Sequence, residues 1–150
     1  METLKSAGIL IESKGKFLLG HATNLETGGI GFFDQRWTIP KGIIDDGETS
    51  IDAAIRETLE ETGIDVVNLG FHPTFYKSIS YTVKTETVHY KKELDIFYIN
   101  DEVGSLQDKL FVCTSMITGT VVPEIDKFLW VNKEQCKLMV FKSLIQLFTN

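Results

Sequence analysis

Cysteine, histidine and proline are all scarce in this chain of 150 residues, which holds two, three and three of them respectively. Cys113 and Cys136 belong to no C-x-x-C pair, so the sequence predicts neither a zinc knuckle nor a disulfide framework. Two reduced cysteines are typical of a cytoplasmic protein, and we expect that location. The histidines show no metal-ligand spacing, which favours surface or hydrogen-bonded histidines over a histidine-based metal centre.

Long apolar runs are missing as well. No stretch approaches the roughly 18 residues of a membrane-spanning helix, so we expect no membrane partner. Residues 1–17 read as a strand rather than a signal peptide. Internal repeats, low-complexity tracts and linkers are absent from the sequence, and its length fits one domain over residues 1–150.

Positive charge is in deficit, because 15 Lys and Arg stand against 21 Asp and Glu, a formal net charge of −6. This balance argues against a basic footprint for duplex nucleic acid over the whole surface. A ligand that arrives with its own metal ions is compatible with it. Residues 45–65 contain eight acids and one base. The acidity therefore marks one local segment rather than the surface as a whole.

Short β-rich segments are spread along the chain. Residues 7–11 and 17–19 predict two strands joined by a Gly-containing turn, and residues 21–36 predict a flexible loop. Further strands are expected at 37–40, 66–69, 75–83, 94–99 and 128–131, and an amphipathic helix at 133–148. Without regular βαβ alternation, this order predicts an α/β (α+β) fold with a mixed β-sheet sandwiched between helices.

The clearest helix signal ends at Thr62. Residues 45–50 supply capping side chains and first-turn acids, and Gly63 supplies a C-terminal stop. One mostly apolar stripe at helical spacing is expected to face the core. Its members are Ile51, Ala54, Ile55, Thr58, Leu59 and Thr62. The opposite stripe of this helix is acidic.

Three carboxylates on this helix, Glu57, Glu60 and Glu61, are spaced at i, i+3 and i+4, so they project from one face. Like charges at that spacing repel each other unless a cation lies among them, and hard oxygen ligands suit Mg²⁺ or Mn²⁺. A solvated acidic face is the alternative. Glu48 and Arg56 are eight residues apart, too far for contact within one helix, but they can pair if Glu48 lies in the entry loop.

The whole pattern resembles the signature of the Nudix hydrolases: Gly, five residues, Glu, seven residues, then Arg-Glu-apolar-x-Glu-Glu-x-Gly-apolar. The chain matches this signature at eight positions, namely Gly42, Glu48, Arg56, Glu57, Glu60, Glu61, Gly63 and Ile64. Thr58, where an aliphatic residue is usual, is the single departure. The resemblance implies a Nudix fold and hydrolysis of a nucleoside diphosphate linked to another moiety.

By the same resemblance, Glu57, Glu60 and Glu61 hold one to three Mg²⁺ ions, and the carbonyl of Gly42 can join them. Glu48, Arg56 and Gly63 are expected to have structural roles in the motif. Glu61 or a loop carboxylate takes the proton of the attacking water, and the sequence leaves the choice open. Glu124 is our candidate for that loop acid or a further metal ligand, and Asp126 is the second candidate. A solvated loop acid is the alternative reading of both.

The approach to the motif, W-x-x-P-K-G from Trp37 to Gly42, is typical of family members that cleave dinucleoside polyphosphates or diphosphoinositol polyphosphates. We therefore expect Trp37 and Lys41 to bind substrate, with the lysine as a point charge on the phosphate chain. Tyr81 lies where such members have a tyrosine that can stack on adenine. The proline typical of ADP-ribose members is replaced by Ile79. A core or surface role is the alternative for each residue.

The sequence favours a Mg-dependent pyrophosphohydrolase of dinucleoside polyphosphates such as diadenosine tetraphosphate. The alternatives are an RNA 5′-pyrophosphohydrolase, a broad pyrophosphatase of ADP-ribose, FAD and nucleoside triphosphates, and a non-catalytic nucleotide sensor. A sensor would be expected to have lost a motif carboxylate, and this chain keeps them all. Lys77, Lys84, Lys91 and Lys92 read best as surface lysines, and positive potential along the nucleotide cleft is the alternative. The oligomeric state is left open.

Overall fold

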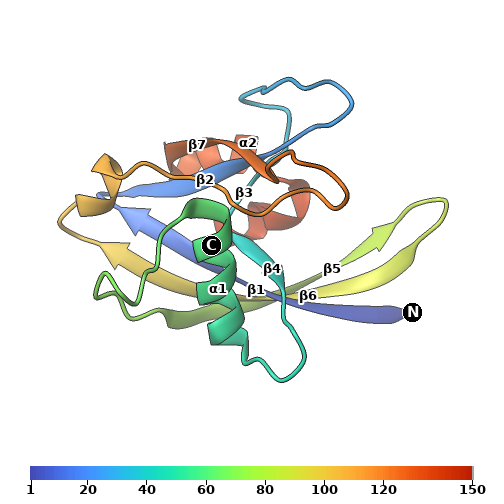
Figure 1. The fold of residues 1–150 in the computed structure, drawn as a ribbon, viewed down its shortest axis with the longest axis horizontal. Helices are drawn as coiled ribbons and strands as arrows, with labels where there is room; N and C mark the ends of the chain where they lie inside the picture. The colour runs from blue at the N-terminus through green and yellow to red at the C-terminus, as the bar shows by residue number, and fades with distance from the viewer. Residues whose placement is uncertain (150) are drawn as a thin grey trace.

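Seven strands form one mixed sheet in the computed structural model, which describes residues 1–149 (Figure 1). The strands are β1 (Glu2–Ser13), β2 (Lys16–Ala22), β3 (Trp37–Thr38), β4 (Lys41–Ile43), β5 (Thr74–Lys84), β6 (His89–Asp101) and β7 (Ile125–Asn132). The helices are α1 (Ser50–Thr62), α2 (Lys133–Met139) and two 3₁₀ turns, η1 (Ser105–Asp108) and η2 (Lys142–Leu147). No helix among the described residues is both long and apolar enough to traverse a bilayer.

Strand β1 lies at the centre of the sheet. It pairs in parallel with β6 along its whole length, from Glu2 opposite Tyr90 to Ser13 opposite Asp101. On its other side it pairs with β4 near Ala7 and with β2 only at the hairpin. The remaining pairs, β2 with β3, β2 with β7 and β5 with β6, are antiparallel. The first hairpin is confirmed, and β4 is a strand that the sequence did not reveal.

The sheet separates two apolar cores. Helix α1 covers one face, where Ala53 and Ala54 pack against β1, and α2 with η2 covers the other (Figure 1). Alternate residues of β1 serve the two sides, since Ile9 belongs to the α1 core and Leu10 to the α2 core. The predicted mixed sheet between helices is therefore confirmed.

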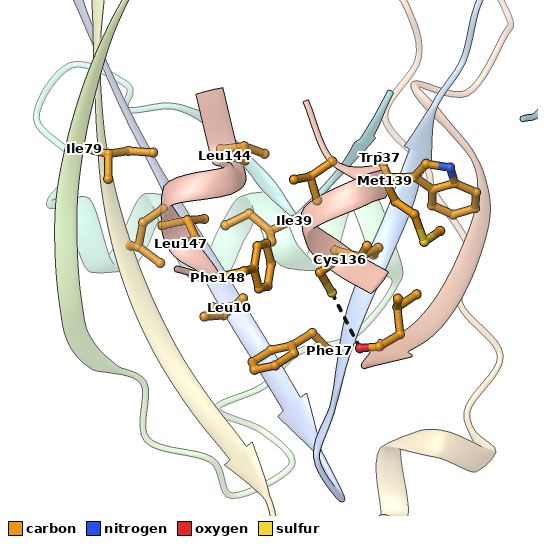
Figure 2. Packing of buried hydrophobic residues seen from close by; sticks show 14 of the residues in the cluster. Leu10, Phe17, Trp37, Ile39, Ile79, Cys136, Met139, Leu144, Leu147 and Phe148 are labelled. Atoms are coloured by element: carbon orange, nitrogen blue, oxygen red, sulfur yellow. Dashed lines mark hydrogen bonds between the residues drawn. The ribbon is translucent and has the colours of Figure 1, made fainter. Parts of the chain in front are cut away.

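The core on the α2 side is the more aromatic of the two. Figure 2 shows Trp37 and Phe148, which are far apart in the sequence, within one cluster, with Met139 beside Trp37. Phe17 meets Phe148 edge-on with 5.4 Å between the ring centroids. The Cys136 thiol donates to the Val131 carbonyl at 3.6 Å, so this cysteine is a packed core residue.

Helix α1 has the predicted ends and most of the predicted buried stripe, since Ile51, Ile55 and the small residues of the stripe pack toward the core and only Leu59 does not. The Thr49 side chain accepts the N–H of Asp52, and Gly63, with φ +81°, closes the last turn. Leu59, expected in the core, is 43% exposed. The buried residues are Ala53, Ala54, Thr58, Glu61 and Thr62. Small side chains let the helix approach β1 closely, and this rotates Glu61 inward.

Two other expectations about secondary structure are wrong. Residues 66–69 form turns rather than a strand, since the N–H of Phe71 donates to the Val66 carbonyl and closes the chain on itself. The helix expected over 133–148 breaks after Met139, where Val140 is extended and bridges Trp37. The N–H of Phe141 then donates to the Trp37 carbonyl at 3.0 Å, and a 3₁₀ turn follows. Tertiary pairing with β3 overrides the helical pattern there.

Candidate active site

A cleft of about 500 Å³ opens where β4, α1, β6 and the segment before β7 meet. Its lining combines acidic, basic and small polar side chains that are far apart in the sequence. They include Thr23, Lys41, Gly42, Glu57, Glu61, Lys92, Ser115, Glu124 and Phe141. The cleft therefore brings together five of the eight residues that the sequence assigns to catalysis, metal binding or substrate binding, together with several that the sequence does not single out.

Glu57 stands at the junction of α1 and β4. Its side chain is 13% exposed, and a Cβ built on Gly42 would collide with its carboxylate. Only glycine allows the backbone of β4 to come this close, which accounts for Gly42 at that position. Burial raises the pKa of Glu57, and the repulsion of Glu60 and Glu124 adds to that effect, while the bond from Arg56 opposes it.

Glu61 is the most deeply placed carboxylate of the cleft, at 6% exposure. Its Oε1 accepts the backbone N–H of Lys41 at 3.2 Å, so helix and strand are tied together at this point. Burial raises the pKa of Glu61 to about 8, and the neighbouring charges of Glu57 and Glu124 act in the same direction. A cation brought into the cleft would favour the ionised form.

Glu60 is not brought into the cleft. Its side chain is 39% exposed and is held by Arg56, with 3.2 Å between Nη1 and Oε2. Its backbone carbonyl accepts the N–H of Thr114 at 2.8 Å, which fixes the loop that follows η1 against the helix. Of the three motif carboxylates, two therefore face the cleft and the third lies at its outer rim.

Arg56 on α1 binds the entry loop through Glu48, the pairing that the sequence left possible. Its Nε donates to Glu48 at 2.8 Å, its Nη2 donates to the other oxygen of Glu48 at 2.9 Å, and its Nη1 reaches Glu57 at 2.9 Å. The fork of bonds lowers the pKa of Glu48 to about 2 and raises that of Arg56. Glu48 lies in the loop before α1 and locks it to the helix, which confirms the predicted pairing.

The donor set of the cleft fits a hard divalent cation. Among residues 1–149, no three acidic, histidine or cysteine side chains form a ready-made metal site, and Nη1 of Arg56 bonds both Glu57 and Glu60. The carboxylates of Glu57 and Glu61 nevertheless share one cleft with Glu124, whose charge adds to the effect of burial in raising the pKa of both. Clustered carboxylate oxygens of this kind are the ligands that Mg²⁺ and Mn²⁺ prefer.

A basic wall faces these acids. Lys41 on β4 and Lys92 on β6 both line the cleft, and Lys92 is half-buried. Burial lowers the pKa of Lys92 to about 8, and the charge of Lys41 beside it adds to the effect. The interpretation of Lys92 as a surface lysine is therefore wrong. Only the pairing of β6 with β1, and of β1 with β4, brings positions 41 and 92 together.

The two loop-acid candidates, Glu124 just before β7 and Asp126 at its start, have different surroundings. Glu124 lines the cleft, its N–H donates to the Ser115 carbonyl, and its own carbonyl accepts the N–H of Thr23, each at 2.9 Å. Asp126 instead bonds His21, with 2.7 Å between Oδ1 and Nδ1. Of the two loop-acid candidates, Glu124 is the one that reaches the cleft.

A second cavity of about 780 Å³ adjoins the cleft and shares Lys41 and Phe141 with it. Tyr81 on β5 lines this neighbouring cavity, half-buried, and burial raises the pKa of its hydroxyl while a bond with Ser143 opposes the rise. Trp37 lines neither cavity, because it is 0% exposed and its Nε1 donates to the Gly31 carbonyl at 2.8 Å. The expectation that Trp37 contacts substrate is corrected, since it is a core residue.

A family model described as the NUDIX domain matches residues 2–143. An uncharacterized 17.7 kDa protein of Enterobacteria phage T4 is 30% identical over 155 residues, covering 100% of this chain and 95% of that protein. The asymmetrical bis(5′-nucleosyl)-tetraphosphatase of Mus musculus is 43% identical over 58 residues, covering 37% of this chain and 40% of that protein. Similarity to that enzyme is thus confined to less than half of its length.

An RNA pyrophosphohydrolase of Bartonella quintana is 27% identical over 133 residues, covering 84% of this chain and 73% of that protein. Among solved structures, a C. elegans Ap4A hydrolase binary complex superposes with a TM-score of 0.61 at 22% identity. That match covers 97% of this chain and 92% of the other, so the two share a fold.

Proposed function

The chain belongs to the Nudix hydrolase family, and from that premise we propose that it cleaves dinucleoside polyphosphates such as diadenosine tetraphosphate. The observation that carries this proposal is the pairing of opposite charges across one cleft, with Glu57 and Glu61 on one wall and Lys41 and Lys92 on the other. A phosphate chain is negatively charged along its length and is stabilised by cations. The two lysines can neutralise part of that charge, and divalent ions held by the carboxylates can neutralise more.

Nudix hydrolases generally use divalent metal ions, and the residues of this cleft suit Mg²⁺ or Mn²⁺. We assign the binding of these ions to Glu57, Glu61 and the carbonyl of Gly42, with Glu124 and Glu60 as further ligands. When bound, such ions neutralise phosphate charge and lower the pKa of a water molecule. In this structure Arg56 donates a hydrogen bond to Glu57. An ion bound by Glu57 would therefore share the carboxylate with Arg56.

The proton of the attacking water has two candidate acceptors. Glu61 is buried and, with a pKa of about 8, holds a proton at neutral pH until a cation favours its ionised form. Glu124 is more exposed than Glu61 and lines the same cleft at the end of the segment before β7. Both are within the acidic group, and both stay candidates for the general base.

The lysines and the neighbouring cavity suit the remainder of such a substrate. Lys41 and Lys92 provide point charges for phosphate oxygens. Tyr81 and Phe141 border the adjoining cavity, where an aromatic face can stack on a base. A dinucleoside polyphosphate extends beyond one nucleotide, and the two connected cavities offer room along the same path.

A substrate panel with product identification tests the proposal. Purified protein with Mg²⁺ is given diadenosine tri- and tetraphosphate, ADP-ribose, FAD, nucleoside triphosphates including 8-oxo-dGTP, and 5′-triphosphorylated RNA. We expect the highest kcat/KM for diadenosine tetraphosphate. A higher kcat/KM for any other substrate would overturn the assignment of this substrate class, and no turnover of any of them would favour a nucleotide sensor.

Removal of pyrophosphate from the 5′ end of RNA is the second candidate function. The similarity to a bacterial RNA pyrophosphohydrolase over most of the chain favours it. Broad hydrolysis of ADP-ribose or FAD is the third, and the same panel separates all three. A cytoplasmic location and the organisation as one domain over residues 1–150 stay predictions.

A further inference from the structure

His21 on β2 is a buried titratable group that the cleft chemistry does not use. Its side chain is 0% exposed, and both ring nitrogens meet a carboxylate oxygen. The distance from Nε2 to Oδ2 of Asp34 is 2.7 Å, and that from Nδ1 to Oδ1 of Asp126 is also 2.7 Å. His21 therefore joins two acids that are separated by most of the chain.

Asp34 is firmly held in its ionised form. Burial alone would raise its pKa, but the bond from His21 and the backbone N–H groups of Gly31 and Arg36 lower it below the usual value. Those N–H groups lie 3.2 and 3.1 Å from its oxygens. A carboxylate that only accepts hydrogen bonds fixes Nε2 of His21 as a donor. The loop that carries Asp34 therefore sets the orientation of the His21 ring.

The second partner of His21, Asp126, lies close to Glu124 in the sequence. Asp126 is the second residue after Glu124, at the start of β7, where the pairing of β2 with β7 shifts register between His21 and Ala22. The neighbouring Thr23 reinforces this junction, because its N–H donates to the Glu124 carbonyl at 2.9 Å and its hydroxyl donates to the Pro123 carbonyl at 2.6 Å. The backbone around Glu124 is thus held by the end of β2 from both directions.

We propose that His21 is a positioning residue for Glu124. The bridge from Asp34 through His21 to Asp126 fixes the first residues of β7, and this fixes where the Glu124 carboxylate enters the cleft. His21 touches no cleft-lining surface, so its effect is indirect. The inference rests on the proposed function, since it requires Glu124 to serve in the reaction. Outer partners of metal ligands typically contribute about 10- to 100-fold to activity.

A double-mutant cycle tests the inference in the full chain with Mg²⁺. The variants are Asp126→Ala, Glu124→Gln and the double variant, assayed with diadenosine tetraphosphate, or with ADP-ribose if that is the substrate cleaved. We expect Asp126→Ala to lower kcat about tenfold or more and to change KM less than twofold. In the Glu124→Gln background the same substitution should have no further effect on kcat, because the residue being positioned is already disabled.

Asp108→Ala, at an exposed aspartate of η1, is the matched control and should retain wild-type kcat. Circular dichroism at the assay temperature checks that each variant is folded. If Asp126→Ala does not fold, Asp126→Asn takes its place, because it keeps the side-chain shape and removes the charge.

Multiplicative losses in the double variant, or an unchanged kcat in Asp126→Ala, would overturn the positioning role. Wild-type kcat in Glu124→Gln would overturn it too, by removing the residue to be positioned, and would withdraw the role of Glu124 from the proposed function. If Glu124→Gln loses activity and the losses of the two single variants multiply in the double variant, only the positioning role fails. The role of Glu124 in the proposed function then stands.

Discussion

The acidic and basic walls of the cleft are built in different ways. Glu57 and Glu61 come from one helical turn, are largely buried, and are each bonded to a neighbour, Arg56 or the N–H of Lys41. Lys41 and Lys92 come from separate strands and meet only because β1 pairs with both. The acids are therefore fixed by local structure, and the lysines depend on the tertiary fold.

This difference has a chemical counterpart. Buried carboxylates held near each other suit ions that must be bound in a defined geometry. Lysines are flexible point charges, which suits phosphate groups that change position and charge during reaction. We expect substitutions on the acidic wall to lower kcat, and substitutions on the basic wall to raise KM.

Loss of an acid should have the largest effect. Glu57→Gln keeps the shape of the side chain but removes a metal-ligand charge, and we expect kcat with Mg²⁺ to fall about a thousandfold or more, since metal catalysis is worth several kcal/mol. Steady-state kinetics with diadenosine tetraphosphate measures it. Asp52→Asn, an exposed acid on the same helix, is the control and should keep wild-type kcat. Unchanged turnover in Glu57→Gln would contradict the metal assignment.

Loss of a lysine should come second. Lys41→Met and Lys92→Met each remove one charged contact, worth about 1.5–3 kcal/mol, so KM should rise about 10- to 100-fold with a smaller change in kcat. The exposed Lys84→Met serves as the comparison and should behave like wild type. If both cleft variants lose kcat and keep KM, the lysines do not bind the phosphate chain of the ground-state substrate. Substitutions of acids and of lysines would then affect the same kinetic constant, contrary to our expectation.

The stacking role of Tyr81 should give a smaller effect. Tyr81→Ala removes one aromatic face, worth about 1 kcal/mol at the lower end, and KM for diadenosine tetraphosphate should rise about fivefold. Tyr81→Phe keeps the ring and should stay near wild type. Tyr76→Ala tests an exposed tyrosine of the same strand, outside both cavities of the site. Equal KM values in Tyr81→Ala and wild type would remove Tyr81 from the binding site.

The smallest expected effect is a shift in thermal stability with pH. Without metal, the pKa of Glu61 is raised from 4.5 to about 8 by burial. Between these values the unfolded chain has lost this proton and the folded chain keeps it, so stability should fall as pH rises from 5 to 8. We expect Tm in EDTA to drop by a few degrees more in wild type than in Glu61→Gln. Parallel Tm curves would contradict the raised pKa.

The helix and its motif could be predicted because their signals are local. Capping by Thr49 and Gly63, and the reach of Glu48 to Arg56, follow from residues within one segment. Most of the buried face of the helix followed from the apolar stripe, but polarity did not predict that Ala53 and Glu61 are buried while Leu59 is exposed.

Features that depend on distant pairing could not be predicted. The exposed-looking Lys92 enters the cleft only through the register of β6 on β1, and the last helix breaks only because Val140 bridges Trp37. His21 likewise carries no sequence signal, since its two partners lie 13 and 105 residues away. Such residues can be identified only in the folded structure, because their roles depend on contacts with residues that are distant in the sequence.

The parallel pairing of β1 with β6 has a consequence for how the protein is made. The Ser13 hydroxyl meets Asp101 across a separation of 88 residues, and the whole strand pair closes a chain loop of that length. Closing such a loop is entropically costly and slow compared with forming a hairpin or a helix. On the ribosome, β1 must therefore wait unpaired on this side until β6 has emerged. During that interval α1 can form with all its carboxylates, but Lys92 on β6 is not yet in place beside Lys41.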